Sequence, residues 1–509
     1  MLVPSPRRAL ALAVLLAWAT VLGVHVRREY FPAAGARLAA GARLLAPGTH
    51  FYLVRLREQV IGFAQASLDT TAAGFRFTDL LQLQVGALGR LHDTRARTLL
   101  ELDPSLGLRS FEFELVSDAG RFEVQGRARD ALLELALRSA GDERRTSIPL
   151  TPDLLLGAAL PMRLAAAGAL EVGREHSWKV FDPSSLSSRL VTARVTGRDT
   201  MIVSDSARQT PAGTWEVTVW DTVPVWRLEQ SFGGVRVVSY VDEDGQMVRE
   251  ESPLGYVIER TTYELAREAW EAARRAPAAT GGYGTLIEGT AIASNIALDD
   301  SAQRGRLVVR LRGVDLAGFD LQGGRQQLRG DTLIITRERL RPAGYRLPFR
   351  GRGEPAAELG SEPLIQSDDP RIVAAARLAA GGATDPVTAA QLLNAWVYRT
   401  LGKDIALTVP SALQVLAVKR GDCNEHTVLY VALARALGLP ARTAAGLVHV
   451  RGRFYYHAWP EVWLGSWVAV DPTLGQFPAD ASHLRFLYGG LARQVELIRL
   501  IGRLQLEVQ

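Results

Sequence analysis

The amino-acid sequence predicts an α+β protein of 509 residues, with an N-terminal membrane helix, a large antiparallel β domain, a small β domain and a C-terminal domain of helices and strands. Three observations predict this class. A long apolar run lies near the N-terminus, strand-like alternation dominates the first half, and helical spacing of apolar residues returns in the last third. The predicted boundaries are 1–28 for the membrane anchor, 48–270 for a half-barrel-like β domain, 281–355 for the small β domain and 365–509 for the C-terminal domain.

The N-terminal anchor is predicted from an apolar run between Ala9 and Val26 that has arginine pairs on both sides. The run is close to the shortest length that spans a bilayer. Ala17-Trp18-Ala19 is a poor cleavage site because apolar sequence continues past it, so we expect an uncleaved anchor that is followed by an exported chain.

Composition limits the possible functions. The formal charge of +5 is small for this length and argues against a nucleic-acid partner. A single cysteine excludes an internal disulfide and a thiolate metal site, and the histidines lack metalloprotease spacing. The sequence also lacks a phosphate loop and a dinucleotide fingerprint, so we expect no cofactor and no metal ion.

The large β domain is predicted from short alternating segments between about Phe51 and Glu264, separated by regular turns. This pattern favours an extended antiparallel sheet with one solvated face. Residues 152–167 are expected to form one or two helices that cover the sheet. A scaffold and a ligand-binding cradle are both compatible with this domain. Its clearest strands are 51–56, 111–115, 121–124, 132–135, 214–219 and 235–240.

A second group of elements follows the large β domain. A helix over 262–275 and a linker over 276–284 precede the small β domain, whose clearest strands are 307–311 and 331–336. Trp396 belongs to an apolar helical stripe, so we assign it to the core in preference to an oxyanion donor. The final amphipathic stretch is expected to pack on the C-terminal domain. The helices predicted for this domain are 370–380, 386–401, 411–420 and 491–504.

The only cysteine, Cys423, begins a helix predicted to run to about Leu437, because apolar residues recur at helical spacing until Gly438 ends the pattern. Asp422 and Glu425 have the spacing of a capping box. A helix N-terminus favours negative charge, so we expect a lowered thiol pKa, as a nucleophile needs. The alternative is that Cys423 is a small buried hydrophobic residue.

Three short runs after this helix predict an antiparallel meander over 442–450, 454–463 and 467–470. A turn near Gly465 places Asp471 opposite Trp459, which makes His457 and Asp471 diagonal neighbours on one face. A carboxylate there can fix the imidazole tautomer while the other ring nitrogen takes the proton of Cys423.

Residues 365–509 contain segments that resemble the motifs of the bacterial transglutaminase-like domain family: Gly421-Asp422-Cys423, Gly438-Leu439-Pro440-Ala441-Arg442, His457-Ala458-Trp459 and Val470-Asp471-Pro472-Thr473. The resemblance implies a papain-like core with Cys423 as nucleophile, His457 as general base and acid, and Asp471 as the residue that orients the histidine. The family includes cross-linkers, peptidases, other amidases and inactive members.

These observations predict a membrane-anchored cysteine hydrolase or acyltransferase that acts on amide bonds of a protein or peptide through a thioester. The backbone N–H of Cys423 is the first expected oxyanion donor, and Gln414 is a candidate for the second. The alternative is a silent envelope binding or assembly protein with a vestigial triad. We expect a single-pass protein of the bacterial inner membrane with its C-terminal part in the periplasm, and leave the oligomeric state open.

Overall fold

The computed structural model describes residues 34–275 and 290–509, apart from 57, 88–89, 119, 140, 152, 297, 299–302 and 405–408. The predicted membrane helix within 1–28 and the predicted linker at 276–284 lie outside the described residues. Within the described ranges, none of the helices combines the length and the apolar character needed to cross a membrane.

The predicted α+β class is wrong, because the described residues are mostly β, with 48% of them in strands and 21% in helices. Length explains the imbalance. Strand β11 (Ser187–Gln209) has 23 residues and β12 (Trp215–Phe232) has 18, whereas the longest described helix, α8 (Pro386–Thr400), has 15. The large sheet therefore contains more of the described residues than the helices of the C-terminal domain do.

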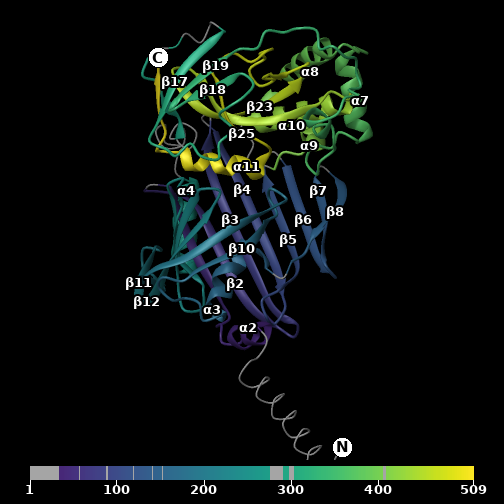
Figure 1. Cartoon of the computed structure of the whole chain (residues 1–509). Helices are drawn as coiled ribbons and strands as arrows, with labels where there is room; N and C mark the ends of the chain where they lie inside the picture. The colour runs from purple at the N-terminus through teal and green to yellow at the C-terminus, as the bar shows by residue number, and fades with distance from the viewer. Residues whose placement is uncertain are drawn as a thin grey trace, which may run out of the picture.

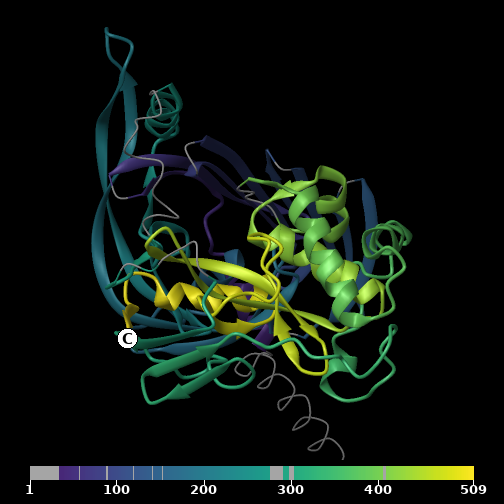
Figure 2. The same ribbon diagram turned by 90° about the horizontal axis from the view of Figure 1, so that it is seen from above.

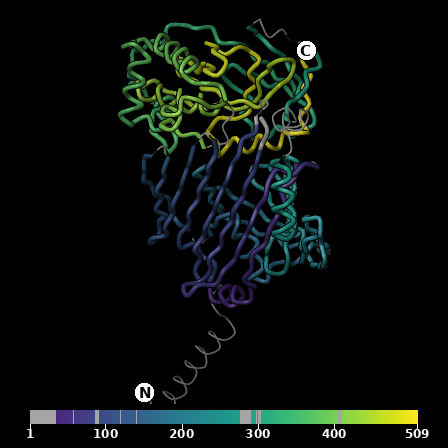
Figure 3. The backbone as a smooth tube through the Cα atoms, turned by 180° about the vertical axis from the view of Figure 1, so that it is seen from behind, coloured from purple at the N-terminus to yellow at the C-terminus, as the bar shows by residue number. Residues whose placement is uncertain are grey.

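The large β domain is one continuous sheet, which has 15 strands among the described residues. β1 to β8 pair consecutively as an antiparallel meander, and β10 to β15 form a second run that joins the first where β15 pairs with β1. Figures 1 and 3 show these strands running from the short helix α2 (Ala34–Ala42) to the C-terminal domain. The strands are β1 Gly48–Leu56, β2 Gln59–Thr71, β3 Gly74–Ala87, β4 Arg90–Leu102, β5 Leu108–Ser117, β6 Gly120–Arg129, β7 Leu132–Ser139, β8 Asp142–Pro149, β9 Leu154–Leu156, β10 Glu175–Asp182, β11, β12, β13 Val235–Val241, β14 Met247–Glu251 and β15 Tyr256–Thr261.

The sheet is curved, and its concave face carries the core of the domain (Figure 2). Alternate residues along each strand point to this face, where Leu68, Leu100 and Phe111 are almost fully buried. The covering elements include η1 (Gly157–Ala159) and α3 (Leu160–Ala166), which occupy the segment where helices were predicted.

The C-terminal domain places helices against a smaller sheet with the strand order β16-β23-β22-β25, and β24 also pairs with β23. Helix α10 (Cys423–Ala436) lies between this sheet and the other helices, and most of its residues are buried. Trp396 is partly buried against the same core, in agreement with its assignment. Helix α4 (Tyr263–Arg275) packs on β1 and β2 of the large β domain. The remaining elements of the C-terminal domain are β16 Ile292–Ala293, α6 Glu354–Ala357, α7 Pro370–Ala380, β20 Gly402–Lys403, α9 Ala412–Val418, β21 Arg420–Gly421, β22 Ala441–Val450, β23 Arg453–Trp463, β24 Trp467–Ala469 and β25 His483–Tyr488.

A third sheet joins the small β region to the end of the chain. Its order is β18 (Gln326–Arg329), β19 (Thr332–Thr336), β17 (Arg306–Arg312) and β26 (Gln505–Val508). The helix predicted over 491–504 is therefore shorter than expected. It consists of α11 (Leu491–Gln494) and η2 (Val495–Leu500), after which the chain extends to pair with β17. Side chains of this sheet share one core with β22 and β25.

The large β domain contacts the C-terminal domain next to the segment that leads to Cys423. Arg371 pairs with Asp142 at 2.7 Å, and Arg420 donates to the backbone oxygen of Asp118 at 2.6 Å. Since Arg420 begins β21 and α10 starts three residues later, this interface supports the position of the cysteine-bearing helix.

Candidate active site

Helix α10 begins at Cys423, as the sequence predicts. Asp422 is the N-cap and accepts from the backbone N–H of Asn424 at 2.8 Å, while Glu425 accepts from the backbone N–H of Asp422 at 2.9 Å. The predicted capping box is confirmed. A side chain at Gly421 would place its Cβ 2.3 Å from Cβ of Glu425, so a glycine is needed directly before the cap.

The meander also has the expected register. Glu461 pairs with Ala469, Trp463 pairs with Trp467, and the backbone N–H of Val470 donates to the oxygen of Pro460 at 3.0 Å. Continuing this register by two residues places Asp471 opposite Trp459. Asp471 is therefore a diagonal neighbour of the histidine two residues before Trp459.

His457 and Asp471 are joined by a hydrogen bond of 2.8 Å between Nε2 and Oδ2. Both are buried, with exposed fractions of 8% and 0%. Oδ1 of Asp471 accepts from the backbone N–H groups of Thr473 and Leu474 at 2.7 and 2.9 Å, which fixes the carboxylate. A carboxylate oxygen can only accept, so the proton of a neutral His457 lies on Nε2 and leaves Nδ1 as the basic nitrogen.

A second histidine shares the same carboxylate. His483 donates from Nε2 to Oδ2 of Asp471 at 2.9 Å, and its Nδ1 contacts Oδ1 of Asp480 at 3.2 Å. Burial lowers the pKa of His483, but the two carboxylates outweigh this effect and raise the pKa overall. His483 is thus held as a cation between two anions.

The pKa of the Asp471 carboxyl reflects the same balance. Burial favours the protonated form, yet His457 and His483 together hold the pKa of Asp471 well below its usual range. Sequence analysis missed His483 and Asp480 because they follow the recognised motifs: Asp480 lies in a loop, and His483 begins β25, a strand that was not predicted. The Asp-x-Ser-His pattern at 480–483 is too short to indicate a partner for Asp471.

Cys423 lies where α10 packs against β23, and it retains some exposed surface. Burial raises the pKa of its thiol well above the usual value, and the negative charges of Asp422, Glu425 and Asp471 raise it further. A hydrogen bond from the backbone N–H of Ala458 acts in the opposite direction. The expected lowering of the thiol pKa is therefore not found, since desolvation and nearby carboxylates raise it.

The three predicted site residues lie in one region, but only two of them contact each other directly. His457 and Asp471 are in direct contact, whereas Cys423 approaches β23 at Ala458, the residue after His457. Among the described residues, no hydrogen bond joins the thiol to the imidazole.

Gln414 does not serve as the second oxyanion donor expected of it. Its Oε1 accepts from the hydroxyl of Ser139 at 2.7 Å, across the interface with the large β domain. Its Nε2 lies 2.4 Å from the position of a Cβ on Gly120, which confirms close packing against that domain. Gln414 therefore belongs to the domain interface.

His457, Asp471 and His483 are the described residues whose donor atoms could together hold a metal ion, because these atoms lie within 4.8 Å of one another. All three side chains are buried and already linked by hydrogen bonds through Asp471. A metal ion would have to replace the protons of these bonds, so the donor set fits a hydrogen-bonded group better than a metal centre.

Comparison with known proteins agrees with the motifs. Residues 374–472 match the family model of the transglutaminase-like superfamily. An uncharacterized protein of Mycobacterium leprae is 29% identical over 118 residues, which cover 18% of this chain and 42% of that protein. The chain thus spans less than half the length of this relative.

Two solved structures resemble parts of the chain at low similarity. A candidate cysteine protease from Cytophaga hutchinsonii is 14% identical with a TM-score of 0.27, over 41% of this chain and 83% of that chain. A β-barrel-like protein of unknown function from Brucella abortus is 13% identical with a TM-score of 0.30, over 43% of this chain and 95% of that chain. The family match thus identifies residues 374–472 as the part of this chain that is similar to the transglutaminase-like superfamily.

Proposed function

We propose that the C-terminal domain is a cysteine enzyme that cleaves or transfers amide bonds of a protein or peptide through a thioester on Cys423. The observation that carries this proposal is the buried hydrogen bond of 2.8 Å between His457 and Asp471, on a strand that packs against the helix beginning at Cys423. A nucleophile, a base and an orienting carboxylate are the parts that such a reaction needs.

The reaction starts from a neutral thiol, because the pKa of Cys423 is raised in the free protein. As Sγ bonds to the substrate carbonyl carbon, the thiol proton passes to Nδ1 of His457, and the carbonyl oxygen becomes an oxyanion. Collapse of this intermediate breaks the C–N bond, and the same proton leaves with the amine. The thioester is then attacked by water or a second amine, with His457 accepting and returning one proton.

The oxyanion needs hydrogen-bond donors. The backbone N–H of Asn424 is used by Asp422, whereas the N–H of Cys423 has no partner among the described residues. It is therefore free to stabilise the oxyanion, an interaction typically worth about 3 kcal/mol when well directed. The helix N-terminus adds a favourable potential for the same charge.

His483 and Asp480 support the base without contacting the substrate. The His483 cation offsets part of the Asp471 charge, and Asp480 keeps His483 protonated. Asp471 can therefore stay ionised in a fully buried position, which keeps Nε2 of His457 protonated and Nδ1 available to Cys423.

An acyl-transfer probe tests the proposal without knowledge of the natural substrate. We expect p-nitrophenyl acetate to release a burst of one nitrophenolate per chain and to leave an acetyl group on Cys423, detected by mass spectrometry. Cys423→Ala should lose both signals. Hydroxylamine added after the burst should remove the acetyl group, as expected for a thioester.

A histidine pair separates catalysis from loss of fold. His457→Ala should slow acetylation by about 10²-fold or more, because general-base catalysis contributes roughly 10²–10⁴-fold. His449→Ala is the matched control, since His449 is equally buried in the neighbouring strand but lies away from Asp471. Equal acetylation rates in both variants would contradict the role of His457.

The second candidate function is a silent binding protein, and the raised thiol pKa favours it. In that case the burst would be absent from the native chain, and Cys423→Ala would leave every measured property unchanged. The acetylation experiment therefore distinguishes the two functions directly.

A further inference from the structure

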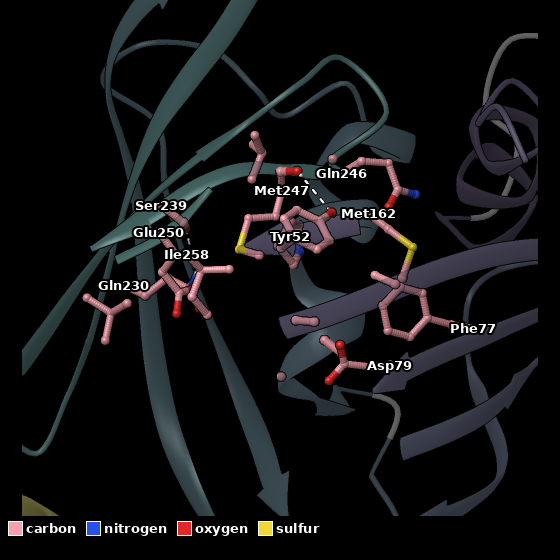
Figure 4. Close-up of a pocket in the computed structure, with 18 of the residues that line it drawn as sticks. Tyr52, Phe77, Asp79, Met162, Gln230, Ser239, Gln246, Met247, Glu250 and Ile258 are labelled. Atoms are coloured by element: carbon pink, nitrogen blue, oxygen red, sulfur yellow. Dashed lines mark hydrogen bonds between the residues drawn. The ribbon is translucent and has the colours of Figure 1, made fainter. Parts of the chain in front are cut away.

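A cavity of about 390 Å³ lies on the concave face of the large sheet, away from the cysteine site (Figure 4). Its size falls in the usual range for small-molecule sites, roughly 300–1,000 Å³. The cavity exists because several positions on this face carry small side chains, including Ala64 and Ala66 of β2. Gly157 and Ala158 of the covering segment also leave space.

Most of the wall is apolar and adaptable. Tyr52, Phe77 and Ile258 contribute from β1, β3 and β15, and Met162 and Met247 approach from α3 and β14 (Figure 4). Methionine side chains adjust to ligands of different shape, and aromatic faces attract organic cations.

Two carboxylates, Asp79 and Glu250, interrupt the apolar wall. Asp79 pairs in register with Ala66, and Glu250 pairs with Ser239 and Ile258, so all of these side chains share the concave face. β3 and β14 are four strand spacings apart along the sheet, roughly 19 Å if the sheet were flat. Curvature shortens this separation enough for the charge of Asp79 to raise the pKa of Glu250.

Neither carboxylate has a hydrogen-bond or ion-pair partner among the described residues. The neighbouring cation Arg260 is already paired with Asp242 at 2.9 Å and with the backbone oxygen of Met247. Burial raises the pKa of Asp79 to about 6, and burial together with Asp79 raises the pKa of Glu250 to about 7. Both side chains are partly exposed within the cavity, so they offer a cationic ligand two carboxylates that no described residue pairs with.

We propose that this cavity binds an amphiphilic amine, with the ammonium group between Asp79 and Glu250 and the apolar part against Tyr52, Phe77 and the two methionines. A divalent cation fits less well, because the described residues offer no third acidic or histidine ligand at this position. The apolar wall likewise has no role in holding a bare metal ion.

Calorimetric titration of the full chain with octylamine, octanol and octanoate at pH 8 tests the proposal. We expect saturable binding of one octylamine, at least tenfold tighter than octanol, and no binding of octanoate. Octylamine affinity should fall more than about tenfold between pH 8 and pH 5, because the carboxylates take up protons that the ammonium must displace. Equal affinities for octylamine and octanol, or no pH dependence, would overturn the proposal.

Variants locate the site. Asp79→Asn with Glu250→Gln should lower octylamine affinity at least tenfold and leave octanol binding unchanged, whereas Ala66→Phe should weaken both ligands by filling the cavity. Glu251→Gln is the matched control, since Glu251 lies next in the strand and pairs with Arg249 on the opposite face. Loss of octylamine binding in the control, or unchanged binding in the double variant, would contradict the assignment.

The inference is independent of the cysteine chemistry. Cys423→Ala should bind octylamine like the native chain, so failure of the acetylation experiment and failure of this one are distinguishable. If the native chain bound Mg²⁺ tightly and the Asp79 and Glu250 double variant did not, the cavity would be a metal site and the amine proposal would be wrong.

Discussion

Replacement of Asp471 by asparagine is the sharpest test of the buried network. The amide oxygen of the new side chain would be retained by Thr473 and Leu474, which donate backbone hydrogen bonds to Oδ1 of Asp471. The amide NH₂ would then face the Nε2 atoms of His457 and His483, where the native carboxylate oxygen accepts from both.

The expected cost in stability follows from these contacts. Hydrogen bonds to charged groups contribute about 1.5–3 kcal/mol each, and breaking a buried ion pair costs about 3–5 kcal/mol. Part of the loss is recovered when His457 accepts from the new amide. We therefore expect Asp471→Asn to lower the free energy of unfolding by about 3–5 kcal/mol, measured by urea denaturation with tryptophan fluorescence.

The same change should suppress the chemistry. When Nε2 of His457 accepts from an amide, the ring proton moves to Nδ1, which can no longer take the proton of Cys423. The corresponding wrong tautomer costs about 10⁴-fold in Ser-His-Asp enzymes. We expect acetylation of Cys423 to fall by about 10³-fold or more. Because the chain has one cysteine, mass spectrometry follows this residue alone.

Asp242→Asn is the matched control for this experiment. It removes a carboxylate that pairs with Arg260 at 2.9 Å in the large β domain, far along the chain from the site. The control should lose stability but keep the native acetylation rate. An Asp471→Asn protein with native stability and a native rate would refute the reasoning about the network.

Three further predictions concern the surroundings of the site. His483→Gln should lower the free energy of unfolding by about 2–3 kcal/mol. Because the pKa of His483 is raised in the folded protein, the loss should be largest below pH 6.5 and become smaller as pH rises through that pKa. Urea denaturation at several pH values measures this dependence. The pKa of Asp480 is lowered, so its contribution to folding stability should be complete above about pH 4 and be lost as pH falls further. Asp480→Asn should therefore reduce the loss of stability at acid pH in the same measurements. Gly421→Ala should cost about 1–3 kcal/mol and slow acetylation, because its Cβ would lie 2.3 Å from Cβ of Glu425 and displace the capping box; an unchanged melting temperature would contradict this.

Local features of the site were accessible from sequence because short-range rules decide them. The capping box depends on Asp422 and Glu425 alone, and the register that brings Asp471 to His457 depends on the turn near Gly465. These predictions are confirmed. The domain boundaries and the periplasmic location stay predictions.

Other features depend on contacts that no local pattern contains. Gln414 was expected near the oxyanion but bonds to Ser139, because the packing of two domains decides where its side chain lies. The final segment ends as a strand beside β17, since an unpaired sheet edge offers backbone hydrogen bonds that a continued helix would not use.

The sequence by itself determined which residues begin the helix, which side chains alternate on each strand, and which motif carries the cysteine, histidine and aspartate. Only the tertiary structure decided that His483 shares Asp471, that burial and three carboxylates raise the thiol pKa, and that a curved sheet brings Asp79 toward Glu250. The physical reason is range. Capping and alternation act over a few residues, whereas desolvation and charge coupling depend on every segment that packs around a group.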